Sequence, residues 1–495
     1  MENTGRIKKY ILPEIRDILY CAESEDQLVR ELDTTTKINY AHVLMLAERG
    51  CIKQRDAKKL LDAISEMKAE RYAEVLKQPL HRGLYLAYES VLIGRVGLDT
   101  GGLLQYGRSR NDLKATVLKM QLREPLISLY GRLIEFIELL LEKSHEYNRV
   151  IMPAYTHYQP AVPITYGHYL LGIAQCFSRS TVHFEAVLDE LDSCPLGAGA
   201  VGGTTVRIDS DRTANLLGFD NGVSNSVDAV ASRDYVLRIL AEITVLECNI
   251  TRICEDLLLW TSSDFGFIDM PDFMVGGSSM MPNKRNVFVL ENIRGRTAAS
   301  SGAFISAVNA MSGAPFSNSI AVGTEGVSFV WKPLKSCAEN LFLISCVVRH
   351  GTPNVKVMRE RAKSGYTLAT EQANYIVCNT NHSFRDAHGI IGEMITRSEE
   401  NSLEYDSEFS RWVKENLGHE PYDSMTTISD LFLDMANYGG GPGLDSWNTQ
   451  NCQLTAAVSA IKERLNNRIA GYADADRRLE AAVIQFLKRG GPYEL

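Results

Sequence analysis

The stretch VLRILAEITVLECNITRICEDL, residues 236–257, decides the fold class of this 495-residue chain. Its apolar residues recur at alternating spacings of three and four, and the stretch contains neither Gly nor Pro. These apolar residues are Val236, Ile239, Ile243, Leu246, Ile250, Ile253 and Leu257. Such a heptad repeat predicts a long helix whose apolar side packs against nearly parallel partner helices.

Two further stretches predict long helices of the same kind. A second apolar repeat follows Pro125, which we expect to start or kink its helix; it consists of Leu126, Leu129, Leu133, Phe136 and Leu140. Residues 164–191 also lack Pro. We therefore predict an all-α chain built on a long central helix bundle. One chain can hardly bury the apolar sides of so many long helices by itself, which indicates an oligomer.

The segments between these helices have a different composition. Residues 100–112, 153–163, 195–205 and 269–286 are rich in Gly, Pro, Ser, Thr and Asn, which is typical of loops at helix ends. We predict an N-terminal helical domain over residues 1–112, the bundle over 113–360, and a smaller, looser C-terminal helical domain over 361–495.

Composition excludes several classes of function. The chain is 45% hydrophobic and 23% charged, as expected of a soluble globular protein. Its net charge of −9 comes from well-mixed residues and argues against a nucleic-acid partner. The first twenty residues contain no apolar run of the length that a signal peptide or a membrane span requires. The ten cysteines show no metal-ligand spacing. We expect a cytoplasmic protein without a membrane partner or a metal.

The first candidate loop is GRSRND at residues 107–112, just before a predicted helix. Ser109, Arg110 and Asn111 could bind an anion, because the backbone N–H groups of a helix start add to their side chains. The alternative is a helix cap at Asn111 or Asp112 with solvated arginines, and it stays open here.

Two other loops carry polar groups that suit acid–base chemistry. Residues 153–160, PAYTHYQP, contain Thr156 and His157, an anion donor and a group for proton transfer, followed by Gln159. Residues 276–286, GGSSMMPNKRN, combine paired glycines with paired serines and predict a mobile flap. Each loop also has an alternative without chemistry, and both alternatives stay open. His157 could be a structural histidine, and residues 276–286 could be a flexible linker.

Taken in order, these three loops resemble the signature regions of argininosuccinate lyase, within the fumarase/aspartase superfamily. The flap resembles the superfamily pattern GSxxMxxKxN, and THYQPAVPITYGH at residues 156–168 resembles the second region. PLGAGAVGGT at residues 195–204 and NSVDAVASRDY at residues 225–235 extend the resemblance. It covers approximately residues 40 to 395.

The resemblance implies a tetramer whose active sites are shared between subunits, and a reaction that needs no cofactor. It implies Ser278 as the general base and His157 as the group that transfers a proton at the leaving group. Lys284 would stabilise the serine alkoxide and, together with Asn286, would bind a substrate carboxylate. The resemblance also implies that Arg110, Asn111 and Thr156 hold the succinyl half of the substrate. The substrate would be a small dicarboxylate.

The sequence departs from the family pattern where the amino-acid half of argininosuccinate is expected to bind. In residues 313–326, Asn318 stands in place of a Tyr, while Gly323 and Gly326 stand in place of a Gln and a Lys. Nearer the N-terminus, Asn39 replaces a serine of the family pattern. Tyr85 and Leu86 replace its His-Thr pair. A pocket that has lost its polar partners no longer fits its old ligand.

We therefore predict a biosynthetic lyase that releases fumarate from another N-substituted aspartate or substituted succinate, or that adds an amine to fumarate in reverse. Asn318 is then expected to bind substrate. One alternative is a true argininosuccinate lyase with a drifted pocket, which cleavage of argininosuccinate would reveal. Another is a retired enzyme that serves as a structural oligomer, against which the retained polar flap argues.

Overall fold

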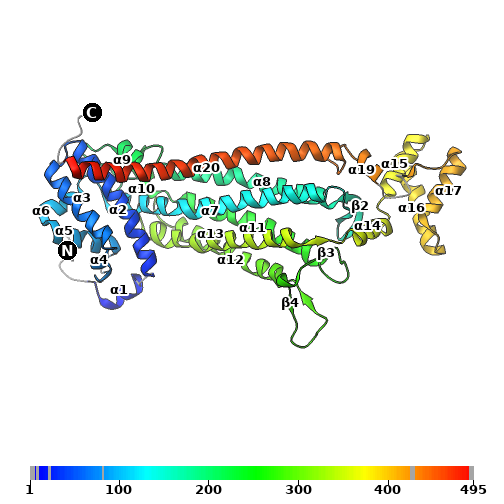
Figure 1. Cartoon of the computed structure of the whole chain (residues 1–495), viewed down its shortest axis with the longest axis horizontal. Coiled ribbons are helices and arrows are strands. Elements are labelled where there is room, and N and C mark those ends of the chain that lie inside the picture. Colours follow the sequence, from blue (N-terminus) through cyan, green and yellow to red (C-terminus); the bar gives the residue numbers. More distant parts are fainter. Residues whose placement is uncertain (1–5, 7–10, 21–23, 81–82, 424–429, 490–495) are drawn as a thin grey trace.

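The computed structural model describes residues 6, 11–20, 24–80, 83–423 and 430–489. It is an elongated bundle of long helices with a group of shorter helices at each end (Figure 1). The prediction of an all-α chain with a long central bundle is confirmed. The three-part domain division stays a prediction.

Helices of 4 to 24 residues form the N-terminal end of the molecule. They are α1 (Pro13–Leu19), α2 (Glu25–Glu48), α3 (Gln54–Ala69), α4 (Ala73–Leu76), α5 (Leu84–Val96), α6 (Leu98–Gly101) and the 3-10 helix η1 (Gly102–Gln105), joined by α9 (Ser210–Leu216) and α10 (Ser226–Ala231). Helix α2 begins where Ser24 caps it, because the Ser24 N–H donates to the Gln27 side chain in a capping box. Apolar side chains of α2, α3 and α5 share one buried cluster.

Five long helices form the centre. They are α7 (Arg110–Glu146), α8 (Tyr166–Leu191), α11 (Asp234–Trp260), α12 (Phe288–Ser312) and α13 (Trp331–His350). Both predicted apolar repeats lie in the shared core of these helices, and every residue of the α7 repeat is fully buried. Each buried Leu contributes about 2 kcal/mol relative to an exposed one.

Helix α7 begins fifteen residues before Pro125, which lies inside it. Of the two predicted alternatives, that Pro125 starts or kinks its helix, the start is therefore wrong. Proline removes one backbone hydrogen bond from a helix interior. Apolar residues on both sides of it, including Leu118 and Leu122 before and Leu126 and Leu129 after, pack into the same core and keep the helix continuous.

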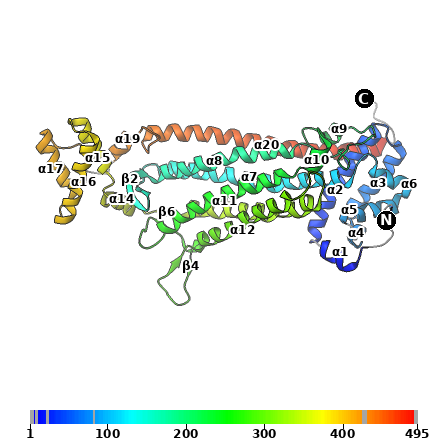
Figure 2. The ribbon, with the colours of Figure 1, turned by 180° about the vertical axis from the view of Figure 1, so that it is seen from behind.

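The strands are short and pair in three antiparallel ribbons: β1 (Ile151–Thr156) with β2 (Gln159–Thr165), β3 (Ile268–Asp269) with β6 (Thr352–Pro353), and β4 (Gly276–Gly277) with β5 (Arg285–Asn286). Two short turns of helix complete the loops, η2 (Asp272–Met274) and η3 (Ala321–Gly326). The first ribbon caps one end of the bundle, and the third projects from its side (Figures 1 and 2).

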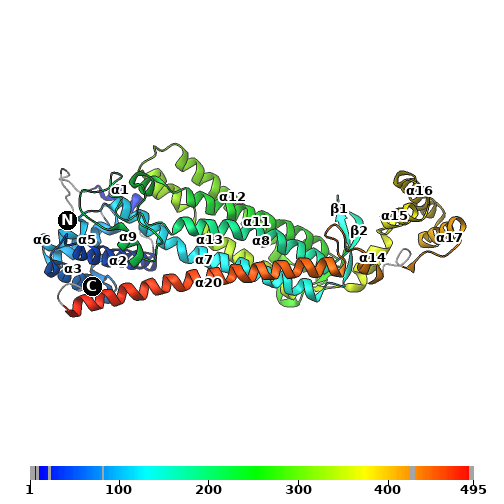
Figure 3. The same cartoon turned by 90° about the horizontal axis from the view of Figure 1, so that it is seen from above.

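The far end holds α14 (Val355–Ser364), α15 (Ala369–Asn379), α16 (Phe384–Asn401), α17 (Tyr405–Leu417) and α19 (Asp430–Met435). The final helix, α20 (Leu444–Arg489), spans 46 residues and runs back along the whole bundle (Figure 3). From α20, Trp447, Leu454 and Val458 pack into the bundle core, and Leu479 and Val483 pack into the N-terminal cluster.

Candidate active site

The start of α7 is built around Asp112. Ser109 is the N-cap, and its own N–H donates to Asp112 Oδ1 at 3.0 Å. The other carboxylate oxygen of Asp112 accepts the N–H groups of Gly197 (3.0 Å) and Gly199 (2.9 Å). The cap that the sequence left open at Asn111 or Asp112 is therefore Ser109, with Asp112 as its capping-box partner.

Asp112 also fixes the glycine-rich loop of residues 195–205 to the start of α7. Burial raises the pKa of its carboxyl, while the backbone N–H groups of Gly197, Ser109 and Gly199 act in the opposite direction. Gly197 and Gly199 have φ of +109° and +62°, a conformation that favours glycine. Sequence reasoning missed this anchoring role, although the capping-box spacing of Ser109 and Asp112 was its visible signal.

Asn111 connects this region to the segment that departs most from the family pattern. Its side-chain Nδ2 donates to the carbonyl of Ala200 at 3.3 Å. Its Oδ1 accepts a hydrogen bond from Asn318 Nδ2 at 3.1 Å, across 207 positions of sequence. Of the predicted site residues, Ser109, Arg110, Asn111 and Asn318 are thus brought together.

The electrostatics around Arg110 point to the same region. Burial raises the pKa of both Tyr85 and Glu89, while the positive charge of Arg108 and, after it, that of Arg110 act in the opposite direction. Both arginines therefore lie near two side chains of α5. The start of α7 can offer cationic and amide donors to a carboxylate, as expected of an anion site.

The second loop forms the turn between β1 and β2. Thr156 and Gln159 pair across the ribbon, and His157 and Tyr158 make the two-residue turn. Both turn residues have positive φ, +52° for His157 and +63° for Tyr158, a conformation that costs non-glycine residues energy. Tyr158 is 83% exposed. An exposed, strained tip of this kind is typical of a functional loop.

The third loop is the flap between β4 and β5. Ser278 follows β4 directly, and its Oγ accepts the N–H groups of Met281 (3.0 Å) and Met280 (3.3 Å). The Lys284 N–H donates to the Met281 carbonyl at 3.2 Å, which closes the turn. Asn286 pairs with Gly276 at the base of the flap. Two N–H donors on Ser278 Oγ would stabilise an alkoxide at that atom.

These three groups of residues do not meet within one chain. Helix α7 has 37 residues, and at 1.5 Å per residue its two ends, Arg110 and Glu146, lie about 55 Å apart, with the β1–β2 ribbon following the second end. The two ends of α12, Phe288 beside the flap and Ser312 before the segment that holds Asn318, lie about 37 Å apart. The ribbon and the flap also lie apart in both side views (Figures 1 and 2).

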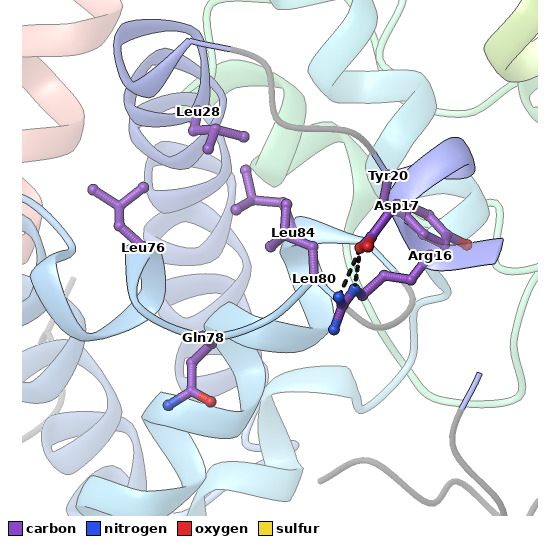
Figure 4. A pocket seen from close by; sticks show the side chains of 8 residues that line it. All are labelled: Arg16, Asp17, Tyr20, Leu28, Leu76, Gln78, Leu80 and Leu84. Carbon is purple, nitrogen blue, oxygen red and sulfur yellow. Dashed lines mark hydrogen bonds and ion pairs between the residues drawn. The ribbon is translucent and has the colours of Figure 1, made fainter. Parts of the chain in front are cut away.

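A cavity of about 380 Å³ lies elsewhere, beside α1 (Figure 4). Leu28, Leu76, Leu80 and Leu84 form its apolar wall, and none of the predicted site residues lines it. Within the described ranges, no group of three His, Cys, Asp or Glu side chains could hold a metal ion. No helix in those ranges has the length and apolarity that crossing a membrane requires.

Comparison with known proteins connects this geometry to a family. The family described as "Lyase" matches residues 33–301, and the one described as "Argininosuccinate lyase C-terminal" matches residues 366–417. The chain is 34% identical over 395 residues to argininosuccinate lyase of Methanocorpusculum labreanum, covering 79% of each chain. It is 33% identical over 376 residues to that of Methanocaldococcus jannaschii, covering 76% of this chain and 77% of the other.

Solved structures share the fold. An EDDS lyase variant with bound fumarate superposes with a TM-score of 0.83 at 24% identity, covering 99% of both chains. The class II fumarase of Schistosoma mansoni superposes with a TM-score of 0.65 at 16% identity, covering 82% of this chain and 92% of the other. The chain belongs to the lyase family as an argininosuccinate lyase-like member of the fumarase/aspartase superfamily, and it is a carbon–nitrogen lyase.

Proposed function

We propose that this lyase eliminates an amine from an N-substituted aspartate or related substituted succinate other than argininosuccinate, releasing fumarate, or catalyses the reverse addition. The observation that carries this proposal is the hydrogen bond between Asn318 and Asn111. It brings the divergent segment 313–326 against the loop proposed to hold the succinyl half. The leaving group would therefore meet Asn318 and its small neighbours instead of the larger polar residues of the family pattern.

The chemistry requires removal of a weakly acidic C–H proton next to a carboxylate. The resulting carbanion spreads its charge into that carboxylate, so donors must already be placed there. In the proposal Arg110, Asn111 and Thr156 hold the succinyl half, with Ser109 and Gln159 beside them. The last of these, Gln159, pairs with Thr156 in the ribbon.

The flap would supply the base. Ser278 would remove the proton as an alkoxide, supported by the N–H groups of Met280 and Met281 that its Oγ already accepts. Lys284 would stabilise the alkoxide, and Asn286 would bind a substrate carboxylate. His157 would deliver the proton that the departing amine needs. None of these steps calls for a cofactor.

We also propose that the protein works as a homotetramer with sites shared between subunits. The support is the distance of about 55 Å that α7 places between the first and second loops, since one chain cannot assemble both around a small dicarboxylate. The exposed Tyr158 at the tip of the ribbon is consistent with a loop that reaches into another subunit.

The test is to supply argininosuccinate to the purified protein and to follow fumarate by its ultraviolet absorbance. We expect negligible release, because the guanidino group would lose water without gaining partners in a pocket lined by Asn318, Gly323 and Gly326. Efficient release would refute the specificity and favour a true argininosuccinate lyase, the reading that the names of the relatives support.

A second arm identifies the leaving group. Fumarate is supplied with a panel of amines and amino acids, and EDDS, on which the structural neighbour acts, is supplied as a cleavage substrate. Consumption of fumarate with one amine identifies the substrate class. If no compound reacts and fumarate does not bind, the chain is instead a retired lyase kept for a structural role.

A further inference from the structure

A line of polar side chains on α2 faces α5 and the loop before α7. Its members recur every three residues: Asp33, Thr36, Asn39 and His42. Thr36 Oγ1 contacts the hydroxyl groups of Tyr88 (3.2 Å) and Tyr72 (3.0 Å). His42 Nε2 donates to the carbonyl of Tyr106 at 3.0 Å. Thr36, Asn39 and His42 are buried and tie α2 to the loop that leads into the candidate site, whereas Asp33 is only partly buried.

Arg108 lies at the centre of this contact and is only 8% exposed. Its Nη2 donates to Asn39 Oδ1 at 2.6 Å and to the Tyr85 hydroxyl at 3.1 Å. Its guanidinium carbon is 5.9 Å from the centre of the Tyr85 ring. Burial raises the pKa of Tyr85 to about 12, so the hydroxyl remains neutral. The buried cation thus donates hydrogen bonds to two neutral partners from different helices, and the carboxyls of Glu89 and Asp112 lie near enough for its charge to lower their pKa against the effect of burial.

The rest of the Arg108 guanidinium has little support. Nε and Nη1 are buried, and within the described residues neither meets an acceptor. A buried guanidinium with open donors is costly, so its orientation depends heavily on the few bonds it makes. Loss of either partner would leave a charged side chain free to move at the entrance to α7.

Arg108 is also close in sequence to the residues proposed to bind substrate, two positions before Arg110 and three before Asn111. The backbone just before it is fixed, because Gly107 has φ of +78° and a Cβ there would lie 2.9 Å from Ile208 Cγ2. Through its bond to Arg108, Tyr85 therefore holds the stretch of backbone that carries Arg110 and Asn111.

We infer that Arg108 is a positioning residue that sets the placement of Arg110 and Asn111, and that Asn39 and Tyr85 act through it as a single unit. Both partners stand where the family pattern has other residues, a serine and a histidine. Asn39 and Tyr85, two departures from the family pattern that lie 46 positions apart, would then together be one adaptation of the loop that binds substrate. A misplacement of about 1 Å in such a loop can cost on the order of a hundredfold in rate. This inference rests on the proposed function.

The test compares two hydroxyl deletions beside the same polar residues of α2. Tyr85→Phe removes a bond to Arg108, whereas the control Tyr72→Phe removes bonds to Asp33 and Thr36 and leaves Asn39 and Arg108 untouched. Both should lower the melting temperature. Only Tyr85→Phe should weaken fumarate binding, measured by calorimetry, by on the order of tenfold, since it removes a bond to a charged group.

A double-substitution cycle tests whether Tyr85 acts through Arg108. We expect Arg108→Met to weaken fumarate binding, and we expect Tyr85→Phe to have no further effect on that background. Asn39→Ala should behave in the same way. The inference is overturned if Tyr85→Phe and Tyr72→Phe affect fumarate binding equally, or if the effects of Tyr85→Phe and Arg108→Met add.

The two proposals fail in distinguishable ways. If the unaltered protein does not bind fumarate, the proposed function fails and this inference falls with it. If the unaltered protein binds fumarate but the two tyrosine variants behave alike, only the positioning role is wrong. Circular dichroism on every variant confirms that the comparison is made on folded protein.

Discussion

Ser278 occupies the first position after β4, where its Oγ accepts two backbone N–H groups of the flap. We predict that Ser278→Ala abolishes turnover and leaves fumarate binding nearly intact, because the base acts only in the transition state. The measurement is the rate of fumarate release with the substrate that the panel identifies. Ser279→Ala, at the next position of the flap, is the control and should keep most of the activity. A near-normal rate for Ser278→Ala would transfer the role of base to His157.

Glu247 is a second residue whose chemistry can be tested, and it lies in the bundle core. It is 1% exposed, and its Oε1 accepts from Asn340 Nδ2 at 2.9 Å. Burial raises the pKa of its carboxyl from 4.5 to about 7. Below pH 4.5 the carboxyl is protonated in both the folded and the unfolded chain. As the pH rises towards 7 only the unfolded chain releases the proton, so the free energy of unfolding falls.

We therefore predict that Glu247→Gln raises the free energy of unfolding at pH 8 by up to roughly 3 kcal/mol, with little change at pH 4. Chemical denaturation across this pH range measures the effect. Glu255→Gln on the same helix is the control, because Glu255 forms a half-exposed ion pair with Arg294 at 2.7 Å. Equal pH profiles for the two variants would contradict the prediction.

At the scale of elements, α20 is held along the bundle by a buried ionic contact. Arg123 of α7 donates to Asp192 Oδ1 at 3.1 Å and lies 4.2 Å from the ring centre of Tyr472 of α20. Arg468 of α20 also pairs with Asp192. Asp192→Ala would leave buried Arg123 without its carboxylate, and should lower the free energy of unfolding by about 3–5 kcal/mol.

The matched control is Asp189→Ala, which removes the exposed partner of Arg468 and should cost less than about 1 kcal/mol. Urea denaturation compares the two variants, and limited proteolysis shows whether α20 detaches first. If Asp192→Ala is no more harmful than Asp189→Ala, then the buried ionic contact does not hold α20, and its apolar face and exposed ion pairs, such as Lys462 with Glu138 and Arg464 with Glu185, do so instead.

At the scale of the whole molecule, the separation of the three loops predicts complementation between inactive subunits. His157→Asn and Ser278→Ala alter different loops. If each site draws these loops from different subunits, mixed tetramers contain some sites in which both residues are intact. Co-refolding the two inactive variants should therefore restore a minor fraction of activity.

Activity recovered after mixing is compared with each variant refolded alone, and sedimentation checks that tetramers form. A site built within one chain would give no recovery, because every chain would then carry one defect. A stable, active monomer in sedimentation would likewise refute both the tetramer and the shared site.

The amino-acid sequence by itself determined the long helices and the loops between them. The repeats in α7 and α11 are local patterns, and a period of three and four positions specifies a helix with one buried side whatever its partners are. The loops could also be predicted from the sequence. Glycine, proline and the polar residues around Ser109 and Ser278 determine the backbone conformation of the few residues next to them.

Only the tertiary structure decided what those elements meet. The contacts of Asn111 with Asn318 and of Arg108 with Asn39 and Tyr85 join positions far apart in the chain, and no local pattern encodes them. The course of α20 along the bundle depends on apolar partners supplied by other helices. The rigid lengths of α7 and α12 separate the three loops, because a helix fixes the distance between its ends at 1.5 Å per residue.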